Sequence, residues 1–259
     1  GFYLMKIAIT GKGGVGKTTV ASLLAKAWVQ DGYKVLAIDA DPVASLGEAL
    51  GFPESDKIIP LSEMSELIEE RTGAKPGTLG QMFKLNPRVD DLTDKIAYLH
   101  NGIRLLVMGG VKTGGSGCVC PESSLIKSLI RHLLLDRDER VIIDMEAGIE
   151  HLGRSTADAV DYMIIIVEPG LRSIHTAQRI KILAEQIGIK RIVAIANKIK
   201  SENDKQFVFN YLDKIKVIGN ISYSDLITKL DRMEIVELDY QTKQEIKSII
   251  DSLEGGILL

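Results

Sequence analysis

The stretch GKGGVGKTTV at residues 11–20 decides the fold and points to a phosphate ligand. Gly11, Gly16, Lys17 and Thr18 satisfy the pattern G-x-x-x-x-G-K-[ST], in which backbone N–H groups turn inward around phosphate oxygens. In this pattern the lysine neutralises charge on the β- and γ-phosphates, and the threonine hydroxyl is a Mg²⁺ ligand. The loop follows an apolar run and opens a segment of helical period, which is the context that phosphate binding needs. The predicted nucleotide-binding residues here are Gly13, Gly14, Val15, Gly16, Lys17, Thr18 and Thr19.

Short apolar runs rich in β-branched residues alternate with longer segments of helical period on both sides of this loop. Several runs are apolar throughout, as expected for strands that are covered on both faces. The alternation predicts an α/β P-loop NTPase fold, with a doubly wound, mostly parallel sheet and helices on both faces. Ligands of such sheets bind at the carboxyl ends of the strands. The predicted strands cover residues 6–10, 34–39, 104–109, 141–145, 162–167, 191–197 and 216–221, and the clearest helices cover 20–32, 122–136, 173–188 and a tail from about 238.

The domain organisation is predicted to be simple. One domain spans residues 5–259, with an insertion of loops and short helices at about 53–101. Residues 1–4 precede Met5 and are interpreted as a cloning remnant.

The composition is that of an ordinary globular protein: 259 residues, 45% hydrophobic and 26% charged, with a net charge of −3. A pI near 5.9 predicts no strongly basic face, so neither nucleic acid nor an anionic membrane is an expected partner. No apolar run reaches the roughly 18 residues that a membrane span needs, and no signal peptide is expected. The two cysteines favour a reducing, cytoplasmic setting over a disulfide framework.

Three aspartates lie at or just beyond the ends of two predicted strands. In LAIDADP, alternation points Asp39 and Asp41 to the same side, toward the phosphates. In VIIDMEAG, an apolar strand ends in Asp144, a pattern typical of a carboxylate that acts on Mg²⁺ through water. The predicted magnesium site is therefore Thr18, Asp39 and Asp144. An alternative is that Asp39 and Asp41 cap a helix that begins at Val43.

A second lysine, Lys12, stands at the start of the loop, where one bound nucleotide does not account for it. The simplest interpretation is that Lys12 is a solvent-exposed loop lysine with no functional role. However, KGGVGKTT resembles the deviant Walker A loop of the MinD/ParA/nitrogenase iron protein class of ATPases. The resemblance implies that Lys12 crosses a face-to-face homodimer and counters charge on the partner's transferring phosphoryl group. It also implies that Asp41 orients the attacking water, so the predicted catalytic residues are Lys12, Lys17 and Asp41.

The segment RIVAIANKIK bears on the nucleotide base, because Asn197 and Lys198 stand at the end of a predicted strand. GTPases carry N-K-x-D there, and the aspartate pairs with guanine. Lys200 occupies that position here, so guanine would lose its carboxylate partner, whereas Asn197 can still pair with adenine. ATP is therefore favoured over GTP. A proline of related proteins is replaced by Ser222, so the far wall of the adenine pocket is not predicted.

The segment GGSGCVCPESS holds both cysteines, Cys118 and Cys120, in a loop before a helix at about Glu122. Its surroundings are too polar for two buried thiols, and a C-x-C disulfide would be a strained ring. Thiolate ligation of a metal is the better interpretation. Two sulfurs make half of a four-ligand site, and a two-fold dimer would supply the other half.

Taken together, KGGVGKTT, DADP, the C-x-C pair and DMEAGIEHLGR resemble the CooC-type nickel-insertion ATPases that mature carbon monoxide dehydrogenase. The resemblance runs over nearly the whole chain from Met5. It implies an ATP-hydrolysing metallochaperone whose dimer, promoted by ATP or metal, holds Ni²⁺ between Cys118 and Cys120 of both chains for delivery to carbon monoxide dehydrogenase or a related nickel–iron–sulfur enzyme. Four thiolates accept Zn²⁺ as well.

Two other functions stay open. The first is an ATPase that carries a bridging iron–sulfur cluster, for electron transfer or as a scaffold. The iron protein has a cysteine in its second switch, whereas residues 141–153 here have none. The second is a MinD/ParA-type positioning ATPase, for which we expect a basic DNA-binding face or a basic amphipathic tail. The sequence predicts neither feature.

Overall fold

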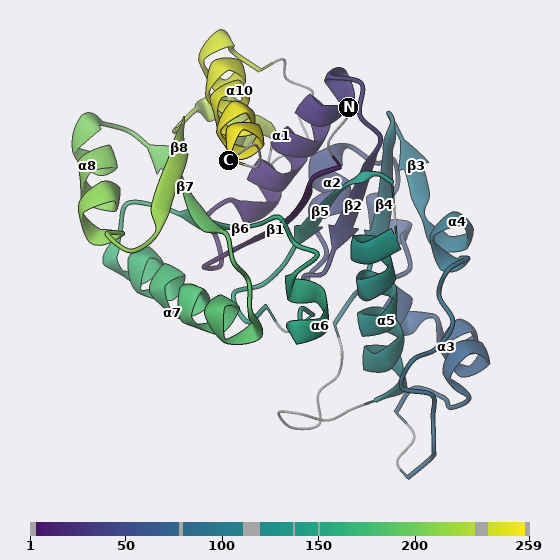
Figure 1. The fold of residues 1–259 in the computed structure, drawn as a ribbon. Coiled ribbons are helices and arrows are strands. Elements are labelled where there is room, and N and C mark those ends of the chain that lie inside the picture. The colour runs from purple at the N-terminus through teal and green to yellow at the C-terminus, as the bar shows by residue number, and fades with distance from the viewer. Residues whose placement is uncertain are drawn as a thin grey trace.

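The fold is built on one central sheet. The computed structural model describes residues 4–77, 80–110, 120–136, 138–149, 151–230 and 238–256. These residues form an eight-stranded sheet with helices on both faces (Figure 1). The strands are β1 (Lys6–Gly11), β2 (Val35–Asp39), β3 (Tyr98–His100), β4 (Ile103–Val107), β5 (Arg140–Asp144), β6 (Tyr162–Val167), β7 (Ile192–Ile199) and β8 (Lys216–Ser222).

The strand order is β3-β4-β2-β5-β1-β6-β7-β8. Every neighbouring pair is parallel except β3 and β4, which are antiparallel at one edge. The predicted α/β class and its doubly wound, mostly parallel sheet are therefore confirmed. β1 lies inside the sheet between β5 and β6, so the loop that follows β1 emerges near the middle of the carboxyl edge.

The inner strands are buried because they are apolar on both faces. Every residue of β1, β2, β5 and β6 is buried, including the aspartates that end β2 and β5. A strand of this kind is stable only where helices cover it on two sides, which is why the apolar runs and the helical segments alternate along the chain.

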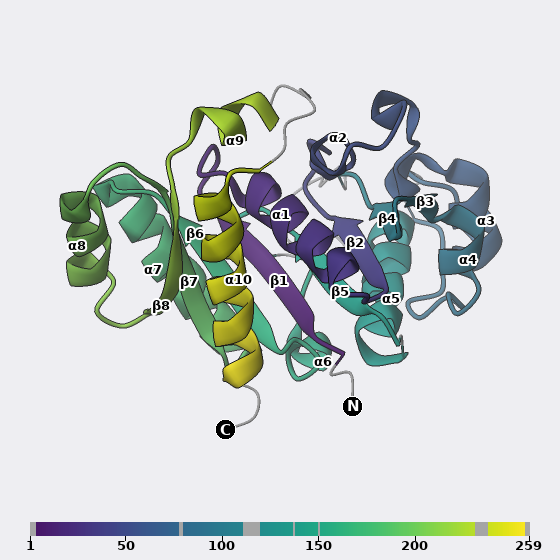
Figure 2. The same ribbon diagram turned by 90° about the horizontal axis from the view of Figure 1, so that it is seen from above.

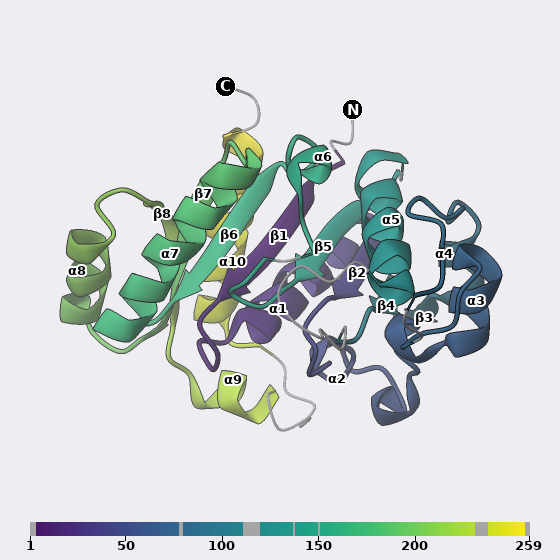
Figure 3. The ribbon, with the colours of Figure 1, turned by 90° about the horizontal axis from the view of Figure 1, so that it is seen from below.

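Two layers of helices cover the sheet, with α1 and α10 on one face and α5 and α7 on the other (Figures 2 and 3). Short 3₁₀ turns occupy Ser55–Lys57 and Leu61–Glu63. In the described ranges no helix combines the length and the apolar character that crossing a lipid bilayer requires. The α-helices are α1 (Lys17–Gln30), α2 (Leu46–Leu50), α3 (Ser65–Thr72), α4 (Leu92–Ile96), α5 (Pro121–Asp136), α6 (Arg154–Ala157), α7 (Leu171–Ile187), α8 (Glu202–Tyr211), α9 (Asp225–Leu230) and α10 (Tyr240–Gly255).

Each layer has its own hydrophobic core. On the α1 and α10 side, Trp28 and Leu24 of α1 pack with Ile249 of α10 in one cluster. On the other side, Leu129 of α5 and Ile180 of α7 belong to a second cluster. All five side chains are at most 1% exposed. The two cores pack α1 and α5 against the sheet. Helix α1 begins at Lys17 of the predicted phosphate loop, and α5 begins directly after Cys120.

The strand register gathers the predicted site at the carboxyl edge. Ile9 of β1 and Asp39 of β2 both lie opposite Asp144 of β5. On the other side of β1, Gly11 lies opposite Ile166 of β6. Parallel strands end at the same edge, so the segments that follow β1, β2, β5 and β6 meet there.

The insertion predicted at residues 53–101 contains the two 3₁₀ turns, α3, α4 and β3. Ile68 of α3 is fully buried and joins the core beneath α5. The Arg71 guanidinium binds both carboxylate oxygens of Asp91, at 2.7 and 2.9 Å, and ties α3 to the start of α4. The edge strand β3 was not predicted from the sequence, because three residues carry too little pattern to be recognised as a strand.

Candidate functional site

The loop after β1 has a backbone that only glycine can adopt at several points. A Cβ at Gly11 would lie 2.6 Å from the Ile166 carbonyl oxygen, and a Cβ at Gly16 would lie 2.4 Å from the Asn197 amide nitrogen. Gly14 and Gly16 also have φ angles of 80° and 93°, which disfavour other residues. Val15 is fully buried, and α1 begins directly after the loop at Lys17. This loop in front of a helix N-terminus suits a phosphate group.

The end of β7 holds the loop from the side. Asn197 donates from Nδ2 to the Val15 carbonyl oxygen at 2.8 Å, and Lys198 donates from Nζ to the Gly14 carbonyl oxygen. Asn197 is buried, and both residues line a small cavity of about 40 Å³ together with Ser222 and other residues. These two predicted nucleotide-binding residues therefore also bind the backbone of the phosphate loop.

Tyr223, which lines this cavity, contacts the lysine that follows β7. Lys200, at the position where a GTPase has aspartate, places Nζ 4.4 Å from the centre of the Tyr223 ring. Ser222, which replaces the expected proline, instead binds the Glu245 carboxylate through its backbone N–H at 2.9 Å and its hydroxyl at 2.6 Å. The preference for adenine over guanine stays a prediction.

Lys17 forms an ion pair with Asp41 at the mouth of the loop. Its Nζ donates to Oδ2 of Asp41, and both side chains are largely buried. Burial on its own lowers the pKa of Lys17, but the hydrogen bond to Asp41 and the nearby charge of Asp144 raise that pKa overall. Lys17 is therefore held as a cation beside the loop, where a phosphate would compete with Asp41 for it.

Thr18 meets Asp144 at the end of β5. The threonine hydroxyl donates to Oδ2 at 2.5 Å, and within the described residues the other oxygen, Oδ1, is buried with no hydrogen-bond partner. Burial raises the pKa of Asp144 to about 7, although the Thr18 hydrogen bond and the Lys17 charge oppose this shift. An unpartnered buried carboxylate oxygen next to a threonine hydroxyl fits a hard cation such as Mg²⁺.

Asp39 is the neighbour of Asp144 in the sheet register, but its contacts are different. Its Oδ1 accepts the N–H of Asp41 at 3.2 Å, and its Oδ2 accepts the N–H groups of Ser45 and Leu46 at 2.9 and 2.8 Å. Burial raises its pKa to about 6 against these hydrogen bonds. Asp39 thus orders the segment between β2 and α2, much as the capping alternative expected. The helix itself begins at Leu46 rather than Val43. A role of Asp39 at Mg²⁺ stays a prediction.

Comparison with known proteins identifies the family. The model of the CobQ/CobB/MinD/ParA nucleotide-binding domain family matches residues 6–235. The chain belongs to this family. It is 50% identical over 230 residues to the carbon monoxide dehydrogenase accessory protein CooC of Rhodospirillum rubrum. The alignment covers 88% of this chain and 87% of that protein. The predicted membership among CooC-type P-loop ATPases is therefore confirmed.

Other relatives agree with this family. The chain is 49% identical over 251 residues to an uncharacterized ATP-binding protein of Methanocaldococcus jannaschii. The alignment covers 95% of this chain and 96% of that protein. The structure of the cell division ATPase MinD of Pyrococcus furiosus aligns with a TM-score of 0.69 at 18% identity, over 98% and 99% of the two chains. That likeness shows the fold alone. This member of the CobQ/CobB/MinD/ParA family is a P-loop ATPase, as predicted.

The second lysine of the ATPase loop, Lys12, lies beside β6. Its Nζ is 3.6 Å from Oε1 of Glu168, which directly follows that strand. Sequence reasoning did not single out Glu168, although its place after a buried apolar strand put it at the carboxyl edge. Lys12 is 36% exposed, so a partner subunit could reach it.

The cysteine segment of the ATPase is described in part. Cys120 is half-buried and stands directly before α5, where its carbonyl oxygen accepts the N–H of Ser124 at 3.0 Å. Cys118 lies outside the described residues. Within the described ones there is no group of three or more His, Cys, Asp or Glu side chains placed to hold a metal. The metal site at Cys118 and Cys120 therefore stays a prediction.

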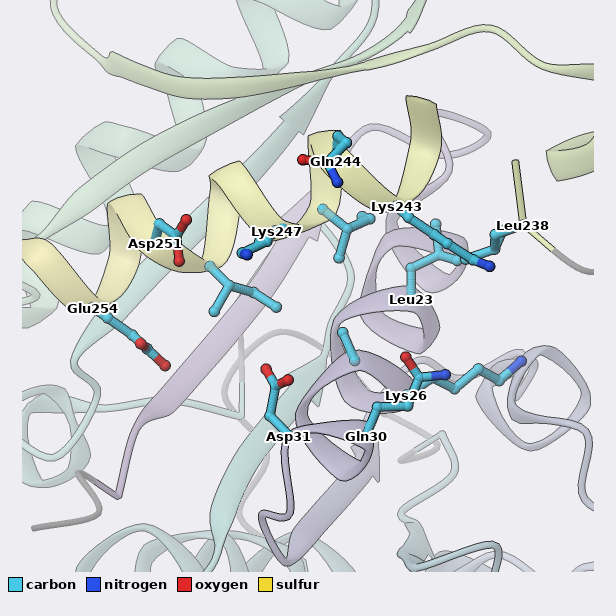
Figure 4. Close-up of a pocket in the computed structure, with 13 residues that line it drawn as sticks. Leu23, Lys26, Gln30, Asp31, Leu238, Lys243, Gln244, Lys247, Asp251 and Glu254 are labelled. Atoms are coloured by element: carbon cyan, nitrogen blue, oxygen red, sulfur yellow. The ribbon is translucent and has the colours of Figure 1, made fainter. Parts of the chain in front are cut away.

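A larger cavity of about 550 Å³ lies between α1 and α10, and Figure 4 shows its lining. Leu23 and Ile250 contribute apolar surface to it. Lys243 lies near one end in the close-up, and Asp251 and Glu254 lie near the other. None of the predicted site residues lines this cavity, so it is separate from the phosphate loop.

Proposed function

We propose that this ATPase is a metallochaperone that delivers nickel to carbon monoxide dehydrogenase or a related nickel–iron–sulfur enzyme. Nickel is its cargo, held by Cys118 and Cys120 of two chains in a homodimer. The observation that carries this proposal is the 50% identity to CooC of Rhodospirillum rubrum over 88% of the chain. The C-x-C pair supports it, because one chain supplies only half of a four-thiolate site.

ATP with Mg²⁺ is the proposed nucleotide. Bound Mg²⁺ would neutralise phosphate charge, and Thr18 and Asp144 would hold it, with Asp39 beside them. A phosphate at the loop would take Lys17 away from Asp41, because one ammonium group cannot stay fully paired with both. Asp41 would then lose its ion-pair partner while its Oδ1 keeps the Val43 N–H at 3.0 Å, and its freed oxygen could orient the attacking water. The ion pair of Lys17 with Asp41 thus gives nucleotide binding a way to change the segment after β2.

The cysteine segment and the ATP site are proposed to be mechanically linked. Cys120 stands at the start of α5, and β5, which follows α5 in the chain, ends at Asp144. A helix antiparallel to its strand begins at the edge where that strand ends, so both groups belong to the carboxyl edge. A helix N-terminus also favours the thiolate form that binds metal. We expect delivery to occur in the cytoplasm, where thiols stay reduced.

The decisive experiment is a titration of anaerobic protein with Ni²⁺, with and without ATP, followed by light scattering. We expect about one metal ion per dimer and a dimer favoured by ATP, by metal or by both. Because linkage is reciprocal, ATP should change the apparent metal affinity by the same factor by which metal changes the ATP affinity. A chain that stays monomeric with both ligands saturating would contradict the proposal.

The matched variant replaces Cys118 and Cys120 with alanine. It should lose stoichiometric metal and keep ATP binding. Metal retained at one per dimer would refute the thiolate site. A broad visible absorption of the untreated protein would instead favour the iron–sulfur alternative, and ATP-dependent binding to DNA or lipid vesicles without metal would favour a positioning ATPase.

A further inference from the structure

The Glu168 carboxylate bridges two lysines of the phosphate-loop region. Its Oε1 is 3.6 Å from Nζ of Lys12, and its Oε2 is 3.4 Å from Nζ of Lys198. Lys198 in turn donates to the Gly14 carbonyl oxygen. One carboxylate therefore contacts both the lysine that begins the loop and the lysine that holds the loop backbone.

The strand register explains why these groups meet. β1 and β6 are neighbours, and Gly11 of β1 lies opposite Ile166 of β6. Lys12 is the first residue after β1, and Glu168 is the first after β6, so the two side chains leave the sheet side by side. The Glu168 backbone is anchored as well, because its N–H donates to the Ser173 hydroxyl at 3.0 Å. The carboxylate is thus presented from a rigid position.

We propose that Glu168 is a positioning residue for Lys12: it holds the ammonium group on its own subunit and releases it when the lysine acts on the partner's nucleotide. This inference rests on the proposed ATP-dependent dimer. Among the described residues, Glu168 is the carboxylate within ion-pair distance of Lys12. An ammonium held there in the monomer has to leave this carboxylate before it can reach across a dimer.

Lys198 lowers the free-energy cost of separating Lys12 from Glu168. Glu168 is 28% exposed, and an unpaired carboxylate at such a site would be only partly solvated. With Lys198 at its other oxygen, Glu168 keeps one cationic partner after Lys12 departs. The Lys12 pair is itself partly exposed, so breaking it should change an equilibrium constant by about 1.5- to 5-fold, the range of exposed ion pairs.

The first test is a double-mutant cycle on ATP-dependent dimerisation, measured by light scattering or analytical ultracentrifugation. Glu168→Gln should lower the dimer dissociation constant by about 1.5- to 5-fold. In a Lys12→Ala background the same change should have no effect. Glu185→Gln is the control, because it removes an exposed ion pair with Lys181 on α7. An equal shift in both backgrounds, or a weaker dimer in Glu168→Gln, would overturn the proposal.

The second test uses nucleotide-free protein and does not depend on dimerisation. The rate at which an amine-selective reagent modifies Lys12 is followed by mass spectrometry, with Lys247 of α10 as the internal reference. Glu168→Gln should raise the relative rate of Lys12 about twofold or more, and Glu168→Asp, which keeps the charge, should restore part of the protection. An unchanged rate of Lys12 modification in both variants would contradict the proposal. A wild-type chain that never dimerises would refute the proposed function while leaving this measurement readable.

Discussion

The Thr18 hydroxyl donates to Asp144 across 2.5 Å and so joins the first turn of α1 to the end of β5. The second oxygen of Asp144 is buried without a hydrogen-bond partner in the described part of the chain. A buried carboxylate with one oxygen engaged and the other oxygen unpartnered costs stability. The same arrangement is ready for a cation that arrives with the nucleotide.

This cost predicts how stability depends on pH. The pKa of Asp144 is about 7 in the folded protein, against 3.8 for an ordinary aspartate. Between these values the folded protein binds a proton that the unfolded chain does not, so the free energy of unfolding falls as pH rises toward 7 and then levels off. Asp39, with a pKa of about 6, contributes with the same sign over a narrower range.

Asp144→Asn should remove most of this pH dependence, because asparagine does not titrate. The measurement is urea unfolding of nucleotide-free protein at several values between about pH 5 and pH 8. The variant should lose less stability than the wild type across this range. Equal slopes for the two proteins would show that Asp144 does not carry the buried proton.

Replacing Lys17 with alanine should severely weaken nucleotide binding. A hydrogen bond to a charged group contributes about 1.5–3 kcal/mol, which corresponds to roughly a 10- to 150-fold higher dissociation constant for ADP or ATP. Isothermal titration calorimetry measures this dissociation constant directly. Lys57→Ala is a suitable control because it removes an exposed ion pair with Glu54. Wild-type affinity in the Lys17 variant would exclude this lysine as a phosphate ligand.

Replacing Lys12 with alanine should separate binding from turnover. ATP affinity should stay nearly unchanged, while hydrolysis falls by about 10³-fold or more, as when a cation supplied in trans is removed from a phosphoryl-transfer site. Phosphate release under saturating ATP measures the turnover. Lys181→Ala, on the outer face of α7, should hydrolyse ATP like the wild type. Equal turnover in the Lys12 variant would remove the argument for a trans-acting lysine.

Gly219 should be sensitive to any side chain. A Cβ there would lie 2.5 Å from Cγ1 of Ile249, which is fully buried where α10 packs on β8. Gly219→Ala should lower the free energy of unfolding by about 1–3 kcal/mol through overpacking. Gly255→Ala is the control, because its Cβ would meet nothing within 4 Å, and alanine in a helix is neutral or stabilises by up to about 1 kcal/mol. Urea unfolding compares the two, and equal stability would contradict the packing argument.

Much of this architecture is readable in the sequence. The run at residues 162–167 was predicted as a strand and is β6 with the same bounds, and the run at 141–145 is β5 shifted by one residue. Buried parallel strands are recognised because their apolar character is continuous and local. The short edge strand β3 and the amphipathic α8 were not predicted, since a three-residue strand and a mostly polar helix give weak local signals.

The candidate site also has features that the sequence determines and features that only the tertiary structure decides. The sequence alone determined the phosphate loop, the aspartates that end two strands and the C-x-C pair, because each is a contiguous motif whose chemistry depends on near neighbours. Only the tertiary structure decided which polar side chains meet: Lys17 with Asp41, Thr18 with Asp144, and Lys12 with Glu168. These contacts depend on strand order and register, which place β5 and β6 on either side of β1, and no local pattern encodes that adjacency.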